Sequence, residues 1–179
     1  MMTAALSLRS RKLGVRCALA LAGPLLLSAG AGAEVKHLDA ALRQAIFTEH
    51  FRVVERVADI PGAVMSAAGQ ARGPKLAQFK LEMADPGQPF QATDVIVNPA
   101  LPGRRLIAAY ASSDYWILHY EAGGIAHTFH FAAFSWRDGR AHLVWHAEVF
   151  HTVATLDDLR RLLRQDDASK VDDADAQFY

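Results

Sequence analysis

The sequence predicts an α+β protein, in which an N-terminal helix and a short second helix pack on a curved antiparallel sheet of about five to six strands. Apolar residues recur at helical spacing near the start of the predicted mature chain and with a period of two further along. Glycine-bearing dipeptides then separate three stretches rich in aromatic and β-branched residues, which indicates hairpins. A C-terminal helix and a disordered acidic tail complete the expected order, and the helices are expected to cover one face of the sheet.

The balanced charge of the chain hides two different parts. The 179 residues include 19 basic and 19 acidic ones, but residues 1–33 hold four of the basic residues and no acid. The rest of the chain therefore carries 15 basic residues against 19 acidic ones. A mildly acidic body argues against a nucleic-acid-binding protein, because such proteins present a basic stripe or patch.

The first 33 residues have the three parts of a secretory signal peptide. A basic segment at Arg9–Arg16 precedes an apolar stretch at 17–29, and Ala31-Gly32-Ala33 supplies the small residues that signal peptidase accepts. The apolar stretch is interrupted by Gly23-Pro24 and is shorter than the roughly 20 residues that a membrane-spanning helix needs. We therefore expect cleavage near Ala33 and a periplasmic or secreted bacterial protein without a membrane span in its mature chain.

Cleavage at that point defines the rest of the predicted organisation. It removes Cys17, the only cysteine, so the mature chain has no disulfide and no cysteine ligand. Residues 34–164 are expected to form one domain, and a domain of that size can be stable on its hydrophobic core alone. Residues 165–179 are rich in Asp and poor in apolar residues, which predicts disorder.

Three segments have the pattern of helices. Residues 38–58 place their apolar side chains on one stripe at helical spacing, so the first helix is expected to extend over the whole segment. Pro61–Gly69 follows as a short second helix. The last helix, Leu156–Arg164, begins after Thr155, which forms a capping box with Asp158 three residues on.

The strands are expected between the second and the last helix. Weak alternation between Pro- and Gly-containing turns predicts three of them: 75–83, Phe90–Val97 and Arg105–Ala111. The clearest pattern in the chain predicts an antiparallel meander of three more: Tyr115–Glu121, Ile125–Trp136 and Ala141–Phe150. Gly123-Gly124 and Asp138-Gly139 join the meander strands, and both dipeptides suit two-residue loops because each position needs a positive φ.

The pairing of these strands decides which side chains share a face, because successive residues of a strand point to opposite sides. With a two-residue loop at Asp138-Gly139, Phe131 faces His146, and Phe129 faces Glu148. The face that contains these residues is then made of His127, Phe129, Phe131, Val144, His146, Glu148 and Phe150. The opposite face is made of His130, Phe134, Trp136, Leu143, Trp145 and Val149.

The connection at Gly123-Gly124 decides which residues of the first meander strand join each face. A two-residue loop places Trp116, Leu118 and Tyr120 with Phe129, and leaves the other face with Tyr115, Ile117, His119 and Glu121. A three-residue loop exchanges the two sets, since a slip of one residue inverts every side chain. Both faces are largely apolar in either case, so helices, loops, a pocket or a partner must cover them.

His127, His146 and Glu148 are the candidate metal ligands, because two imidazoles and a carboxylate on one face suit zinc, copper or another divalent ion. The same groups also suit a general base with its orienting acid. A third interpretation is favoured, in which the histidines occupy half-buried positions and bond to their neighbours, because His-x-Glu on a strand is a weak pattern. No cofactor is therefore expected. His119 and His130 form a weaker pair.

Two further groups are candidate binding residues. Aromatic clusters on strands are usually core, but any exposed members become a binding surface; the cluster here is Trp116, Tyr120, Phe129 and Phe131. Arg137 and Arg140 flank the hairpin turn at Asp138-Gly139, where they can meet acidic groups of a partner. Arg104-Arg105 is expected to be a charged strand edge rather than a phosphate site.

The sequence contains no GxGxxG, no Walker-type phosphate loop and no GxSxG nucleophile elbow. The leading hypothesis is a small exported, non-catalytic binding protein, possibly of the inhibitor or immunity type, that recognises a protein of the cell envelope through its sheet and hairpin loops. The alternative is a periplasmic carrier of a small ligand or metal, with a pocket between the first helix and the sheet. A weaker alternative is an enzyme with a His or Glu base.

The order of helix, short helix and long meander resembles that of cystatin-like and nuclear-transport-factor-like α+β cones. This resemblance covers the order of the elements alone. It implies no functional residue, because no motif of the sequence matches these families residue by residue.

Overall fold

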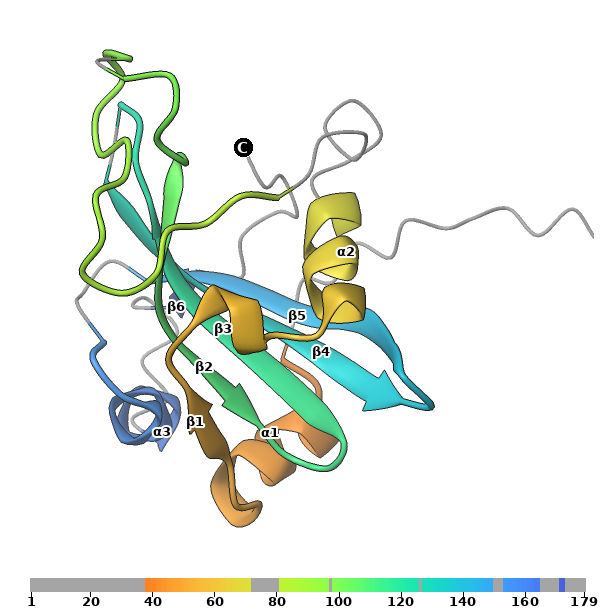
Figure 1. Cartoon of the computed structure of the whole chain (residues 1–179). Coiled ribbons are helices and arrows are strands. Elements are labelled where there is room, and N and C mark those ends of the chain that lie inside the picture. The colour runs from red at the N-terminus through yellow and green to blue at the C-terminus, as the bar shows by residue number, and fades with distance from the viewer. Residues whose placement is uncertain are drawn as a thin grey trace, which may run out of the picture. The chain divides into compact units, whose positions relative to one another are not determined.

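The computed structural model describes residues 38–71, 81–96, 98–125, 127–149, 153–164 and 171–172 (Figure 1). The predicted signal peptide and most of the predicted tail lie outside these residues. Within them the protein has an α+β fold, with three α-helices and one antiparallel sheet. Each strand pairs with the next strand in the sequence, in the order β1-β2-β3-β4-β5-β6.

Four long strands form the centre of the sheet: β2 (Arg104–Ala111), β3 (Tyr115–Ala122), β4 (Thr128–Arg137) and β5 (Arg140–Val149). They confirm the predicted meander and the strand before it. Two short strands flank them, since β1 (Arg52–Val54) pairs with β2, and β6 (Val171–Asp172) pairs with β5. The sequence did not predict β6, which lies in the segment expected to be disordered.

The hairpin between β4 and β5 follows directly from its turn residues. Asp138 and Gly139 both have a positive φ, of 50° and 72°, and Arg137 pairs with Arg140. These values are those of a type I′ turn, whose twist matches the twist of the strands that it joins. The predicted two-residue loop is therefore confirmed.

The first helix is shorter than predicted. α1 spans Ala40–Thr48, and Asp39 caps it by accepting a hydrogen bond from Leu42 N at 2.7 Å. The prediction of one helix over residues 38–58 is wrong beyond this point, because the chain continues into β1 and the short 3-10 helix η1 (Val57–Asp59). β2 offers an edge with which β1 can pair, and β-branched valines suit an extended strand better than a helix.

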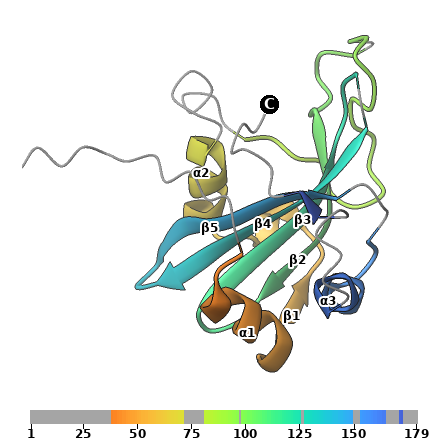
Figure 2. The same ribbon diagram turned by 180° about the vertical axis from the view of Figure 1, so that it is seen from behind.

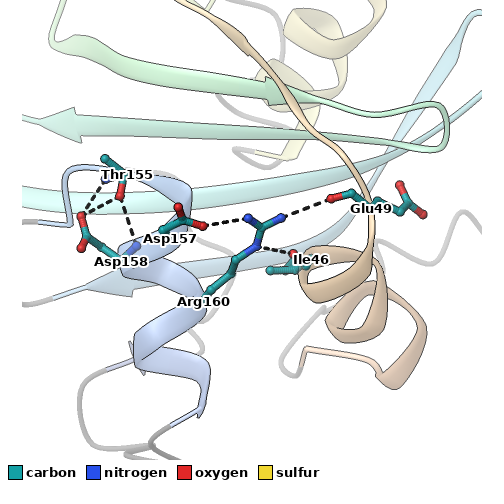
Figure 3. A network of polar contacts seen from close by, with 6 residues as sticks. All are labelled: Ile46, Glu49, Thr155, Asp157, Asp158 and Arg160. Carbon is teal, nitrogen blue, oxygen red and sulfur yellow. Dashed lines mark hydrogen bonds and ion pairs between the residues drawn. The ribbon is translucent and has the colours of Figure 1, made fainter.

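The other two helices confirm the prediction. α2 spans Gly62–Ala71 and α3 spans Leu156–Arg164. The capping box at the start of α3 is present (Figure 3): Thr155 N donates to Asp158 Oδ2 at 3.0 Å, and Asp158 N donates to Thr155 Oγ1 at 3.2 Å. Two backbone donors at the start of the helix therefore have partners, as this motif requires.

The described part of the predicted strand Phe90–Val97 is not a strand. Gln91 does not bond in the pattern of a strand. Its backbone N donates to Pro102 O at 2.9 Å, and its side-chain amide donates to carbonyls of the same segment. The segment makes one isolated bridge, between Thr93 and Gly124. The predicted strand at 75–83 lies largely outside the described residues, and Ala84 at its end makes only a bridge to the beginning of β2.

α1 and α3 cover one face of the sheet, which we call the α1/α3 face (Figure 2). Their buried side chains pack on odd-numbered residues of β3, β4 and β5. The helical side chains of this core are Leu42, Ile46, Leu156, Leu159 and Leu163. The sheet side chains are Ala108, Tyr110, Ile117, Phe131, Ala133, Trp145, Ala147 and Val149.

α2 covers the opposite face, which we call the α2 face (Figure 1). Val64 and Ala68 of the helix pack there with Ile60 and Leu81. The sheet contributes Leu106, Ala109, Ala111, Trp116, Leu118, Tyr120, Ala132 and Phe134. The expectation that helices cover one face alone is therefore wrong, and the two-sided cover explains why both faces are apolar.

Arg160 joins the two helices of the α1/α3 face (Figure 3). Its Nε donates to Ile46 O at 2.7 Å and its Nη2 to Glu49 O at 3.2 Å, at the C-terminal end of α1. Its Nη1 pairs with Asp157 at 2.8 Å. Because the last carbonyls of a helix lack partners within that helix, Arg160 supplies from α3 the donors that the end of α1 needs.

Replacing Arg160 with methionine should lower the free energy of unfolding by about 1.5–3 kcal/mol, because the charged hydrogen bonds to α1 are lost while an aliphatic side chain remains. Arg161→Met is the matched control. Among the described residues Arg161 pairs only with Asp158, and it is largely exposed, so its replacement should change stability by about 0.5 kcal/mol or less. Urea unfolding measures both effects, and equal losses would contradict the role given to Arg160.

Candidate functional site

The pairing of β4 with β5 differs from the predicted one because β5 contains a β-bulge. The register shifts at Val144, which has no partner in β4. An extra residue in one strand moves every pair beyond it by one position. Phe131 therefore faces Ala147. Two predicted pairs are wrong for this reason: Phe131 with His146, and Phe129 with Glu148.

The connection between β3 and β4 is longer than predicted. Ala122 at the end of β3 pairs with Thr128 at the start of β4, so residues 123–127 form the connection. The predicted two-residue loop at Gly123-Gly124 is therefore wrong. The faces match the three-residue alternative instead, because Glu121 pairs with Phe129 on the α1/α3 face.

The bulge in β5 and the longer β3–β4 connection place the candidate metal ligands apart. His127 bonds to Glu121 on the α1/α3 face, whereas His146 is buried on the α2 face. His130, and not His127, is the histidine that pairs across the strands with Glu148. The predicted common face of the three ligands is wrong. In the part of the chain that the structure describes, no three His, Asp or Glu side chains gather where they could hold a metal ion.

The candidate binding residues are also divided. Three of the four aromatic candidates are buried in the two cores, namely Trp116, Tyr120 and Phe131, and Phe129 is half-buried. Arg137 and Arg140 are exposed at the β4–β5 turn. β4 has 10 residues and so separates this turn from His127 by about 30 Å, at roughly 3.3 Å per residue. These arginines and His127 therefore cannot belong to one compact site.

A group of stacked rings lies on the α2 face, with Tyr120 and His146 buried and His130 half-buried. The His130 ring is stacked with Tyr120 at 5.1 Å and with His146 at 5.3 Å between ring centroids. Thr128 Oγ1 lies 2.7 Å from His130 Nε2, and the Tyr120 hydroxyl lies 3.3 Å from His146 Nε2. Burial, with the charge of Arg104, lowers the pKa of His130 to about 4, and burial lowers that of His146 to about 3. Both imidazoles are therefore uncharged at neutral pH.

His119 is the corresponding buried histidine on the α1/α3 face. Its ring stacks on Phe131 with centroids 4.2 Å apart, and within the described residues neither ring nitrogen has a hydrogen-bond partner. Burial lowers its pKa to about 4, so this ring is also uncharged at neutral pH. A buried donor without a partner lowers the free energy of unfolding by about 1–3 kcal/mol. The packing of the surrounding core offsets this loss at His119.

Glu121 organises a polar cluster at the end of β3, which we call the Glu121 clamp. Its buried carboxylate accepts a hydrogen bond from Arg105 Nε through Oε1 at 2.6 Å, and Oε2 lies 2.6 Å from His127 Nε2. Arg105 also donates from Nη1 to Gln88 O at 3.2 Å, and its guanidinium lies over the Phe90 ring at 4.6 Å. The clamp thus connects β2, β3, the β3–β4 connection and the segment around Phe90.

The β3–β4 connection and the segment around Phe90 form one end of the described fold. We call this end, with Val95, Ile96 and Ile125, the apolar tip. Figures 1 and 2 show the segment between residues 81 and 103 beside the ends of β3 and β4. The bridge between Thr93 and Gly124 joins them. Close to this bridge lie three largely exposed aliphatic side chains: Val95 at 64% exposure, Ile96 at 70% and Ile125 at 96%.

Gly123 allows the β3–β4 connection to pack directly against the backbone of Gln91 and Ala92. A Cβ atom at this position would lie 1.8 Å from Gln91 O and 2.7 Å from Ala92 Cα. Both neighbours are backbone atoms, so no side chain can move aside to make room. Gly123 is therefore needed because two backbone segments pass close together here, and not because of a two-residue hairpin turn.

Sequence reasoning missed most of this site. A two-residue β3–β4 loop placed Glu121 on the face opposite His127, and only the three-residue alternative placed the two on one face. Arg105 was treated as part of a charged strand edge. Two signals were present: Glu121 is an acid within a strand of apolar and aromatic residues, and Val95-Ile96-Val97 is a run of apolar residues between Asp94 and Asn98. Neither signal identifies its partners, because the contacts depend on the length of the β3–β4 connection.

Acid should unfold the protein through the three histidines whose pKa burial lowers, namely His119, His130 and His146. Each folded-state pKa lies below 6.5, the ordinary pKa of a histidine, so below that pH the unfolded chain binds more protons than the folded one. The free energy of unfolding should therefore be fully present above about pH 6.5 and fall towards pH 4, by up to about 1.4 kcal/mol per pH unit for each histidine.

Urea unfolding at pH 7.5 and pH 5.0 measures this loss. The variant His119→Leu supplies the control, because it should reduce the dependence on pH by the share of one histidine without weakening the protein at pH 7.5. Equal stability of the parent protein at the two pH values would show that these histidines are not buried in their uncharged form.

The comparisons with known proteins add no family to this description. No family model, no curated protein and no solved structure matches the chain. The resemblance in element order to α+β cones therefore has no support from them. Among the helices that the structure describes, none combines the length and the apolar character required to cross a membrane.

Proposed function

We propose that the protein is a small exported, non-catalytic binding protein that recognises another protein of the cell envelope through its apolar tip. One observation carries this proposal. Among the described residues, three of the four large hydrophobic side chains that are strongly exposed lie at this single end: Val95, Ile96 and Ile125. Exposed apolar side chains that gather at one end of a protein mark an interaction surface more often than scattered ones do.

The Glu121 clamp makes the tip suitable for binding. Arg105 and His127 attach both irregular segments to one buried carboxylate, and the backbone of Gly123 donates to Gly103 O at 3.1 Å. A loop that is already ordered loses less conformational entropy when it binds. The apolar side chains of the tip are therefore presented by a preorganised scaffold, as in many protein-binding loops.

The chemistry of the tip favours a protein partner over a lipid surface. Asp94 directly precedes Val95 and is exposed. Insertion of the tip into a bilayer would take this carboxylate towards hydrocarbon, which is costly for an ionised group. A protein surface can place a donor against Asp94 while it covers the neighbouring aliphatic side chains.

Export to the periplasm, or release from the cell, is part of the proposal and rests on the pattern of residues 1–33. The basic segment, the short apolar stretch and the Ala31-Gly32-Ala33 site support cleavage near Ala33. As a protein of the inhibitor or immunity type, it would then act on an enzyme of the same compartment. Arg137 ends β4 and Arg140 begins β5, at the opposite end of this hairpin from the tip, so neither is part of the proposed surface.

Photo-crosslinking in cells tests the surface. A benzoylphenylalanine placed at Ile96 of the exported protein should give one discrete adduct with an envelope protein. The adduct should disappear in Ile125→Asp, because a carboxylate at the centre of the interface would lose its water without gaining a partner.

Val53→Asp is the matched control, since Val53 is also an exposed aliphatic residue, at 53%, but lies on β1. This variant should leave the adduct unchanged. The proposal fails if the folded, exported protein gives no adduct, or if Ile125→Asp and Val53→Asp reduce it equally.

A further inference from the structure

The Glu121 clamp determines which nitrogen of His127 carries the proton. The guanidinium of Arg105 donates from Nε to Glu121 Oε1 at 2.6 Å, so Glu121 is the carboxylate partner of an ion pair. A carboxylate has no proton to donate and can only accept. The hydrogen in the 2.6 Å contact between Glu121 Oε2 and His127 must therefore belong to Nε2. In the uncharged imidazole, Nδ1 then carries a lone pair and accepts hydrogen bonds.

The His127 side chain reaches the surface, and its ring is held by its neighbours. The His127 side chain is 45% exposed, while its ring packs on Phe129 and Phe90 with centroids 5.0 Å and 5.9 Å away. These two ring contacts and the bond to Glu121 restrict rotation of the imidazole. His127 stands two residues after Ile125, so the acceptor borders the apolar tip.

Arg105 supplies a donor on the other side of the same carboxylate. Its Nε binds Glu121 and its Nη1 binds Gln88 O, and among the described residues no bond occupies its Nη2. The side chain is 29% exposed. The clamp therefore has one acceptor, on His127, and one donor, on Arg105, around a single carboxylate, and both side chains also contact Phe90.

We infer that His127 and Arg105 recognise a main-chain peptide group in an extended, apolar segment of the partner. His127 Nδ1 accepts from a backbone N–H of that segment, and Arg105 Nη2 donates to a backbone carbonyl. Its aliphatic side chains pack on Val95, Ile96 and Ile125. This inference rests on the proposed function and specifies the partner of the same surface.

The pairing of donor and acceptor favours a peptide group over an anion. A ligand carboxylate has no hydrogen to offer to Nδ1, and its charge would face the lone pair of that nitrogen. The positive charge of Arg105 is also balanced already by Glu121. A peptide group matches both functions, because each unit of backbone carries one donor and one acceptor.

Two NMR measurements on the folded mature protein test the inference. The long-range ¹H–¹⁵N spectrum of the imidazoles should show His127 as the tautomer with its proton on Nε2. The protein is then titrated with a capped hexapeptide of alternating valine and threonine, and with the same peptide N-methylated at its central amides. The methylated peptide should bind about tenfold more weakly, because it lacks the donor for Nδ1.

The variant His127→Phe retains a ring against Phe90 and Phe129 but removes the acceptor, so the two peptides should bind it equally. His142→Phe, at an exposed histidine of β5, should keep the tenfold difference. The inference is overturned by a proton on Nδ1, by equal affinities for the parent protein, or by the absence of binding. An Ile125-dependent crosslink that survives such a result would leave the proposed function standing and remove the main-chain recognition alone.

Discussion

The ladder between β3 and β4 buries side chains on both of its sides, and the rest of the described structure depends on this constraint. A sheet with two apolar faces must be covered twice. α1 and α3 cover one face and α2 covers the other, with Arg160 satisfying the carbonyls that α1 leaves open. Polar groups inside the sheet must then be uncharged or paired. The buried histidines are uncharged, and Glu121 is paired with Arg105 and His127.

The elements that the sequence could predict are those with a local cause. The turn at Asp138-Gly139 needs two residues that accept a positive φ, and the capping box of α3 needs Thr155 and Asp158, three apart. The end of α1 has no such signal, because the apolar spacing that suggests a helix continues beyond Thr48. Pairing of β1 with the edge of β2 decides the outcome there, and that contact joins residues far apart in the sequence.

The candidate site could not be assembled from the sequence because two small irregularities decide which residues meet. One unpaired residue, Val144, moves His146 and Glu148 away from Phe131 and Phe129. The longer β3–β4 connection brings Glu121 to the side of His127. Each residue of the clamp was visible, but its partners depend on the parity of the strands. The exposed aliphatic residues of the tip likewise became informative only when the Thr93–Gly124 bridge brought their segments together.

Amide hydrogen exchange in the variant Glu121→Gln tests the central claim, that one buried carboxylate orders the apolar tip. The amides of Gln91 and Gly123, which bond to Pro102 O and Gly103 O, should exchange about tenfold faster than in the parent protein. The amide of Trp136, bonded to Asp114 O at the opposite end of the sheet, should keep its rate. Unchanged protection of Gln91 and Gly123 would contradict the claim, as would an equal acceleration at Trp136.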